Sequence, residues 1–172
     1  MRRLLQIAAL ALLLAACSSA QQICATDSET SHSRPSVPAL ALAGRVTDAA
    51  NVLSAEQRLT LTRELDTFER RTSHQMVVVT VTSLGGRDVA DFARDLGNSW
   101  GIGRKCHDDG IMLLVAPNER KIRIAVGYGL EKTLTLDLSQ RIIDQRILPA
   151  FRRGDLPGGI EAGARAVMSA AS

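Results

Sequence analysis

Aromatic residues and histidines are scarce in this chain, whose 172 residues include three Phe, one Trp, one Tyr and three His. Proteins that bind nucleic acid stack bases on aromatic rings and present dense basic patches, and this sequence offers neither. We therefore expect no nucleic-acid partner. His32, His74 and His107 are scattered and lack the paired ligand spacing of a zinc site built from cysteine and histidine.

Cysteine is equally rare, with Cys17, Cys24 and Cys106 in the whole chain. No catalytic signature accompanies Cys106, so a reactive-thiol function is not expected. Three arrangements of Cys24 and Cys106 stay open, namely a disulfide bond between them, two thiols, or a bond to another chain.

The first residues have the pattern of a signal peptide. Arg2 and Arg3 precede an apolar run that is interrupted by Gln6 and ends at Ser18, which is too short for a membrane span. The end of the run, residues 14–17 (Leu-Ala-Ala-Cys), resembles the lipobox of bacterial lipoproteins. We therefore expect removal of residues 1–16 and lipid on Cys17, with ordinary secretory cleavage near Ala20 as the alternative.

Lipid on Cys17 predicts attachment to a membrane in the cell envelope. Several acyl chains bind a bilayer stably, whereas one chain binds only marginally. In a cell with two membranes, Ser18 after the cysteine resembles the signal for export to the outer membrane, which predicts its periplasmic face. Loss of residues 1–16 removes two arginines and leaves 19 basic residues against 18 acidic ones, so the basic character of the chain comes partly from the signal peptide.

Two regions follow the signal peptide. Residues 17–44 are rich in Ser, Thr, Ala and Gln and show no apolar periodicity, which indicates a lipidated N-terminus and a flexible tether. Residues 45–172 have the length of one domain. The tether would let this domain stand away from the bilayer.

The domain begins with alternating helix and strand signals. Ser54 and Gln57 form a capping box that predicts a helix ending near Thr72. Residues 76–81 form a β-branched run typical of a strand buried on both faces. Asp88 can cap a second helix whose apolar stripe ends at Trp100.

The second half of the domain predicts a hairpin and two helices. Residues 111–116 and 121–126 are strand-like and are joined by a short turn, whereas helices are expected over 138–152 and 157–171. Strands that alternate with amphipathic helices indicate an α/β, three-layer-like sandwich with a mixed β-sheet flanked by helices. The sheet should be parallel at the first crossover and antiparallel at the hairpin.

The loop between Trp100 and the third strand contains the most informative polar residues. Arg104 and Lys105 could hold a phosphate, and Asp108 and Asp109 a hard cation such as calcium. The competing interpretation is that Asp109 and Gly110 simply form a turn and that the side chains of Arg104 and Lys105 are solvated. The loop is neither a dinucleotide fingerprint nor a Walker loop, so no nucleotide cofactor is expected.

Other polar residues lie near predicted element ends. Asp137 or Ser139 can cap a helix, and this structural role is favoured for Asp137 taken alone. Asp48 has no equally obvious structural task. Beyond the third strand lie Gly127, Tyr128 and Gly129, which suit either a close approach of a ligand or a tight exit from the sheet.

An ordered series of short motifs resembles the TPM domain family over about residues 45–167. The motifs are VTD at 46–48, LSAEQ at 53–57, WGIGRK at 100–105, DDGI at 108–111, RKIRI at 120–124, GYGLE at 127–131 and FRRGD at 151–155. The family includes thylakoid lumen proteins of photosystem II repair, an accessory protein of acetylcholine receptors and many bacterial envelope proteins. The resemblance implies an α/β sandwich, and some members are reported as acid phosphatases or bind calcium.

Carried over by position, the resemblance implies a polar site around Asp48, Asp108, Asp109 and the turn at 127–129, with Asp137 a weaker addition. Calcium or another divalent cation is the implied ligand. Asp109 stands where many relatives have asparagine, which is a departure from the family pattern. Many bacterial relatives also carry a membrane helix after the domain, and lipid on Cys17 could replace that anchor.

Two function hypotheses follow from these residues. One is a membrane-tethered binding or assembly module for an envelope protein or membrane complex, with calcium as an expected ligand. The alternative is a metal-assisted phosphomonoester hydrolase in which Asp48, Asp108 and Asp109 hold a cation while Arg104 or Lys105 neutralises phosphate. The module is favoured, because no residue is identified as a nucleophile and the relatives work in unrelated membrane systems.

Overall fold

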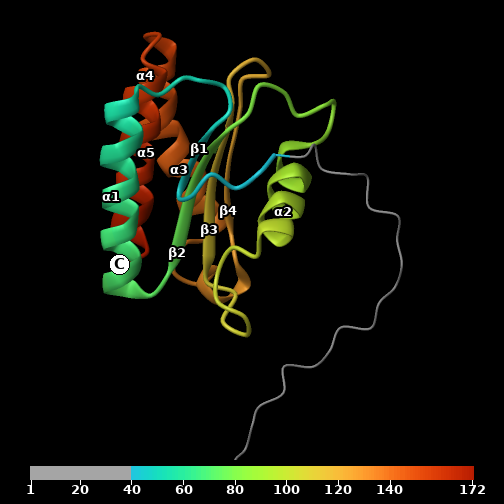
Figure 1. Cartoon of the computed structure of the whole chain (residues 1–172), viewed down its shortest axis with the longest axis vertical. Coiled ribbons are helices and arrows are strands. Elements are labelled where there is room, and N and C mark those ends of the chain that lie inside the picture. The colour runs from blue at the N-terminus through green and yellow to red at the C-terminus, as the bar shows by residue number, and fades with distance from the viewer. Residues whose placement is uncertain (1–39) are drawn as a thin grey trace, which may run out of the picture. The chain divides into compact units, whose positions relative to one another are not determined.

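The computed structural model describes residues 40–172, which fold around a four-stranded mixed sheet (Figure 1). The strands lie side by side in the order β1 (Val46–Asp48), β2 (Gln75–Thr80), β3 (Gly110–Ala116) and β4 (Lys121–Val126). The first three strands are parallel, and β4 runs antiparallel to β3. The expected α/β sandwich, with a parallel first crossover and a terminal hairpin, is confirmed.

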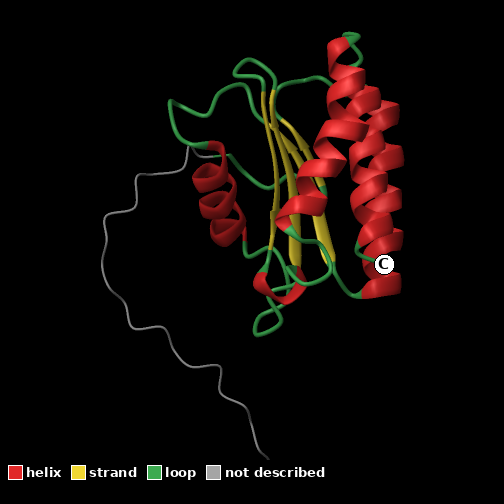
Figure 2. Cartoon of the chain, turned by 180° about the vertical axis from the view of Figure 1, so that it is seen from behind, coloured by secondary structure: helices red, strands yellow, loops and turns green. Residues whose placement is uncertain are grey.

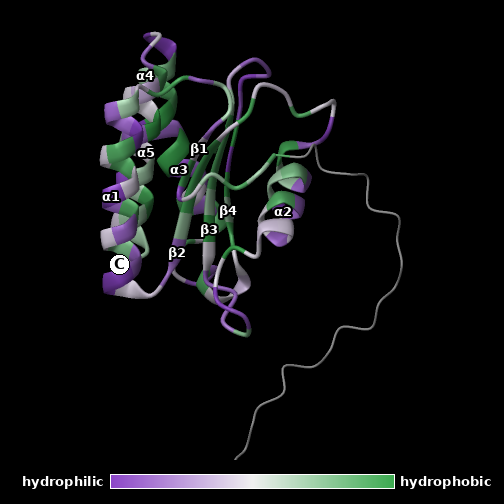
Figure 3. Cartoon of the chain, viewed as in Figure 1, coloured by the Kyte–Doolittle hydropathy of each residue, from purple (hydrophilic) through white to green (hydrophobic). Residues whose placement is uncertain are grey.

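Helices cover both faces of the sheet (Figure 2). One face packs against α1 (Ala55–Thr72), α3 (Leu136–Ile142), α4 (Leu148–Arg152) and α5 (Leu156–Ala170), and the other against α2 (Val89–Trp100). Strand β3 is buried along its whole length because both of its faces are covered. Figure 3 shows the consequence, with apolar residues on the strands and polar ones on the outer faces of the helices.

The predicted caps hold the first two long helices. In α1, the backbone N–H of Gln57 donates to Ser54 Oγ over 3.1 Å, and the Gln57 side chain accepts from the Ser54 N–H over 2.9 Å. In α2, Asp88 Oδ1 accepts from the N–H groups of Ala90 and Asp91. Both starting points are confirmed, because a cap satisfies N–H groups that have no partner inside the helix.

The predicted helix over 138–152 is confirmed as one continuous helical run over 136–152, but it differs from the prediction in two respects. Helix α3 begins earlier, and Thr135 is its N-cap, accepting from the N–H of Leu138 over 3.2 Å, so neither Asp137 nor Ser139 caps it. The run also contains a π-helical turn at Ile143–Ile147, which joins α3 directly to α4. Pro149 explains the π turn, because a proline has no N–H to donate to the carbonyl four residues earlier.

Within residues 40–172, no helix has both the length and the apolar composition that a membrane crossing needs. The predicted signal peptide, Cys17, Cys24 and nearly all of the predicted tether lie outside the described residues. The lipid anchor therefore remains a prediction.

Candidate functional site

Asp48 lies at the carboxyl end of β1, and its side chain is only 1% exposed. The carboxylate accepts hydrogen bonds from the N–H groups of Val52 (3.1 Å) and Leu53 (2.9 Å) and from the Thr80 hydroxyl. These bonds tie the loop before α1 to the end of β2. Asp48 therefore has the structural task that its sequence context did not reveal.

Asp109 immediately precedes β3 and is 3% exposed. Its carboxylate accepts from the backbone N–H of Arg104 and from Arg104 Nε, each over 2.7 Å, and the second guanidinium nitrogen lies 2.6 Å away. Burial raises the pKa of the Asp109 carboxyl, but the backbone and guanidinium contacts of Arg104 outweigh it, so the pKa is lowered overall. Asp109 and Arg104 thus fasten the two ends of one loop together.

The two buried aspartates lie at opposite ends of the sheet. In the register of the sheet, Asp48 pairs with Thr80 of β2, and Thr80 pairs with Val115 near the end of β3. Asp109, in contrast, immediately precedes Gly110, the first residue of β3. Five residues of strand separate Gly110 from Val115, or about 16 Å at roughly 3.3 Å per residue. One ion with coordination distances of about 2.5 Å cannot bind both carboxylates.

The other two predicted metal ligands are exposed. Asp108 has a left-handed backbone with a φ of 48°, and Asp137 forms an ion pair of 2.6 Å with Arg141 on the outside of α3. In the described part of the chain, no group of three or more Asp, Glu, His or Cys side chains is arranged to hold a metal. The structure does not bring the four aspartates together, and ion binding by any one of them stays a prediction.

The turn after β4 presses against the loop before β3. The N–H of Gly127 donates to the Gly110 carbonyl over 2.8 Å, and the N–H of Gly129 donates to the Asp108 carbonyl over 3.0 Å. A Cβ on Gly129 would lie 1.9 Å from the carbonyl oxygen of His107. Only glycine allows this approach, which leaves Tyr128 projecting outward with 80% of its surface exposed.

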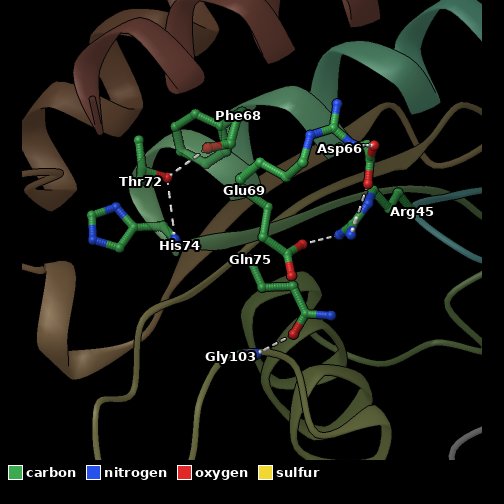
Figure 4. A network of polar contacts seen from close by, with 9 residues as sticks. Arg45, Asp66, Phe68, Glu69, Thr72, His74, Gln75 and Gly103 are labelled. Atoms are coloured by element: carbon green, nitrogen blue, oxygen red, sulfur yellow. Dashed lines mark hydrogen bonds and ion pairs between the residues drawn. The ribbon is translucent and has the colours of Figure 1, made fainter.

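Gln75, at the start of β2, holds the same loop from the other side (Figure 4). Its side-chain oxygen accepts from the backbone N–H of Gly103 over 2.7 Å. Sequence reasoning missed this residue, because a glutamine at the start of a strand gives no signal for a contact 28 residues away. The loop is therefore anchored by Gln75, by Asp109 and by the glycine turn.

A groove of about 330 Å³ lies between α2, β4 and the turn at 127–131. Ala90 and Gly97 on α2 and Ala125 on β4 are small, which leaves this space unfilled. The polar residues around the groove are Arg94, Asn98, Asp108, Arg123, Tyr128 and Glu131. Sequence analysis singled out Asp108 and Tyr128 and quoted Glu131 only as part of the motif at 127–131. It missed Arg94, Asn98 and Arg123, which come from α2 and β4 and meet the turn only in the folded chain.

The remaining predicted site residues have different surroundings. Arg104 is engaged with Asp109, whereas Lys105 is exposed and does not line the groove. Cys106 is disulfide-bonded, so it supplies no thiolate for chemistry. Whether Cys24 is its partner lies outside the described residues.

The fold and the groove define an α/β sandwich domain with a concave surface of mixed apolar and polar residues between α2 and β4. The family model of the TPM domain matches residues 46–170. The N-terminal domain of a protein from P. gingivalis, solved by NMR, is 34% identical, with a TM-score of 0.69 over 73% of this chain and 80% of that one. The chain therefore belongs to the TPM domain family, as its motifs predicted.

Two further NMR structures share the fold at lower identity. The N-terminal domain of a Corynebacterium glutamicum protein is 21% identical, with a TM-score of 0.59 over 76% of this chain and 82% of that one. The BA42 protein from the psychrophilic bacterium Bizionia argentinensis is 20% identical, with a TM-score of 0.59 over 69% of this chain and 80% of that one. No curated protein matches the chain.

Proposed function

We propose that this chain is a membrane-tethered envelope protein whose TPM domain is a binding or assembly module for an envelope or membrane complex. The observation that carries the proposal is the contrast between two sets of polar side chains. The buried carboxylates of Asp48 and Asp109 are used to hold loops, whereas Asp108, Tyr128 and Glu131 are exposed around a groove. Exposed polar side chains around a hollow surface are suited to contact with a partner.

Calcium is part of this proposal and would bind on the groove side, at Asp108. Its carboxylate is exposed and forms no ion pair within the described residues, unlike those of Asp109 and Asp137. Calcium takes six to eight oxygen ligands, as a rule, and Asp108 with Glu131 would supply only part of that number. Calcium held there would have open positions for water or for oxygens of a partner.

The phosphatase is the second hypothesis and has less support. A shared cation would need Asp48, Asp108 and Asp109 close together, but Asp48 lies at the other end of the sheet from Asp109. The phosphate-binding role assigned to Arg104 competes with the contacts that two nitrogens of its guanidinium make with Asp109 Oδ2. A hydrolase would therefore have to use a different set of residues.

The tether is the other half of the proposal, and lipid on Cys17 would hold the domain at the membrane. Labelling of growing cells with a radioactive fatty acid should give a labelled protein, and Cys17→Ala should abolish the label. Equal labelling of Cys17→Ala would reject lipidation at this residue. The N-terminal sequence, rather than any contact in the domain, supports this step.

The binding role is tested by site-specific photo-crosslinking in the native envelope. A photoreactive amino acid at position 128 lies at the rim of the groove, and one at position 153, an exposed site beyond α4, is the control. We expect a discrete crosslinked product from position 128 that is absent from position 153 and reduced by Arg94→Gln. Monomer alone from both positions, under several growth conditions, would contradict the proposal.

A further inference from the structure

A second groove lies between α1 and α5, on the opposite face of the sheet from α2 (Figure 1). Arg165 of α5 contacts Glu64 of α1 over 3.0 Å. Where both helices end, His74 Nδ1 lies 3.1 Å from the Ala171 carbonyl oxygen, so the helices run side by side in the same direction. This α1–α5 groove has a volume of about 610 Å³.

The α1–α5 groove is open because the side chains above its base are short. Thr67 on α1 and Ser169 on α5 are exposed, and both line the groove. The buried ring of Phe68 and the half-buried side chain of Met168 supply an apolar base. Helices pack by fitting the side-chain ridges of one into the grooves of another, so a hollow between two parallel helices suits a third helix.

Two arginines that line this groove have no acidic partner. Helix α1 has four basic residues, and two of them, Arg58 and Arg70, each pair with an aspartate. Arg63 and Arg71 are exposed and form no ion pair within residues 40–172. The unpaired cations of α1 are therefore the ones that line the α1–α5 groove.

The spacing of these arginines matches a helical ligand. Arg63, Thr67 and Arg71 follow one another at intervals of four residues, so they share one face of α1. The Cα atoms of the two arginines are about 12 Å apart along the helix axis, at about 1.5 Å per residue. Two acidic side chains that are about two turns apart on another helix have the same separation.

A simpler interpretation is that both arginines are solvated charges. Arg71 is in the last turn of α1, where a cation interacts favourably with the helix macrodipole. Arg63 lies two turns earlier, so this explanation does not apply to it. A flat bilayer is also a poor match, because the surface is hollow and Glu64 lies among the arginines.

We propose that the α1–α5 groove binds an amphipathic helix of a partner protein, with two acidic side chains about two turns apart that contact Arg63 and Arg71. The apolar face of this helix covers Phe68 and Met168. Binding of an amphipathic helix in a groove is a recurring mode of recognition. The inference goes beyond the proposed function, because it gives the domain a second binding surface, on the face of the sheet opposite α2. One domain can then join two proteins.

The first test is selection on the full chain from a display library of helix-forming peptides of about 20 residues, whose surface positions are randomised. Selected peptides should share two Asp or Glu residues about seven or eight positions apart. Arg63→Gln and Arg71→Gln should each weaken binding about threefold to fivefold, as expected for a partly exposed ion pair. Arg70→Gln is the matched control, because it removes the same charge from the same helix but does not line the groove. Arg63→Glu should prefer peptides in which Lys replaces one acidic residue.

The second test fills the groove and keeps its charges. Thr67→Trp should weaken peptide binding about tenfold or more, because the indole ring occupies the space that the helix needs. The unfolding temperature should stay near that of the wild type, since position 67 is exposed. Thr60→Trp, on the same face of α1 but two turns earlier and outside the groove, is the control and should bind like the wild type.

Three results would overturn the inference. One is a selection that yields no peptide, or peptides whose binding neither arginine substitution weakens. Another is binding to vesicles of anionic phospholipid that Arg63→Gln weakens, without any selected peptide, which would assign the surface to a membrane. The third is self-association of the chain alone that Thr67→Trp abolishes, which would show that a second copy occupies the groove.

The two grooves can be tested separately, because they share no residue. Peptide binding that depends on Arg63 and Arg71, with no crosslinks from position 128, would support the α1–α5 groove and reject the proposed role of the groove between α2 and β4. Crosslinks from position 128 without selected peptides would leave the proposed function standing and reject this inference.

Discussion

The two ends of the sheet each have a buried aspartate, but they differ in what surrounds it. At one end, Asp48 ties down the loop before α1 through two N–H groups and the Thr80 hydroxyl. At the other end, Asp109 fastens a loop through Arg104, and next to it Asp108, Tyr128 and Glu131 are exposed around a groove. A buried carboxylate with satisfied hydrogen bonds stabilises the fold, whereas exposed polar side chains around a groove are available to a ligand.

The largest expected effect comes from breaking the contacts of Asp48. Asp48→Ala leaves the N–H groups of Val52 and Leu53 and the Thr80 hydroxyl without their acceptor. At roughly 1 kcal/mol for each bond, the free energy of unfolding should fall by about 3 kcal/mol. Denaturant unfolding measures this change in the free energy of unfolding. A loss below about 1 kcal/mol would show that water replaces the hydrogen bonds of the carboxylate.

The glycine turn should be the next most sensitive position. Gly129→Ala places a Cβ about 1.9 Å from the carbonyl oxygen of His107, so backbone must move. We expect a loss of about 2 kcal/mol, typical of overpacking, together with weaker binding at the groove. Gly97→Ala is the control, because the nearest atom to its Cβ is 3.8 Å away and alanine favours a helix. Equal stability of the two variants would refute the close approach.

Acidification should affect the Asp109 end in a defined direction. The folded pKa of Asp109 lies below its ordinary value, so its ionised contacts stabilise the fold above about pH 4 and are lost as the pH falls through the folded pKa. The wild type should therefore lose stability more steeply than Asp109→Asn between about pH 4 and pH 2. Unfolding temperatures measured across this range check the sign, and parallel curves would contradict it.

The smallest effect is expected at Asp137. Its ion pair with Arg141 spans one turn of α3, with the two side chains 75% and 57% exposed. Such a pair contributes about 0.5 kcal/mol or less, so Asp137→Ala should unfold almost like the wild type. A loss comparable to that of Asp48→Ala would mean that Asp137 has a structural or ligand-binding role that its surface position does not suggest.

Local features of the fold could be predicted because neighbouring residues determine them. Ser54 with Gln57 and Asp88 marked two helix starts, and alternating residues after Arg120 marked a strand. The π turn before Pro149 was missed, because the apolar pattern of residues 138–152 continues through it. The family was also identified from its ordered motifs.

The candidate site was less predictable, because it is assembled from distant elements. Asp108 and Asp109 are identical neighbours in the sequence, yet one is exposed and the other is 3% exposed. Arg94 and Arg123 reach the same groove from α2 and β4, and no local pattern links them. The sequence indicated that Gly127 and Gly129 permit a close approach. Only the packing shows that the group they approach is the backbone of the loop before β3.

The central claim, that the buried aspartates stabilise the fold whereas the exposed Asp108 beside the groove serves binding, is tested most directly by comparing Asp48→Asn with Asp108→Asn. For each variant, the free energy of unfolding and the crosslinking yield from position 128, per folded molecule, should be measured together. We predict that Asp48→Asn lowers stability and keeps the crosslinks, whereas Asp108→Asn keeps stability and loses them. Unchanged crosslinking in Asp108→Asn, or its loss in folded Asp48→Asn, would contradict this division.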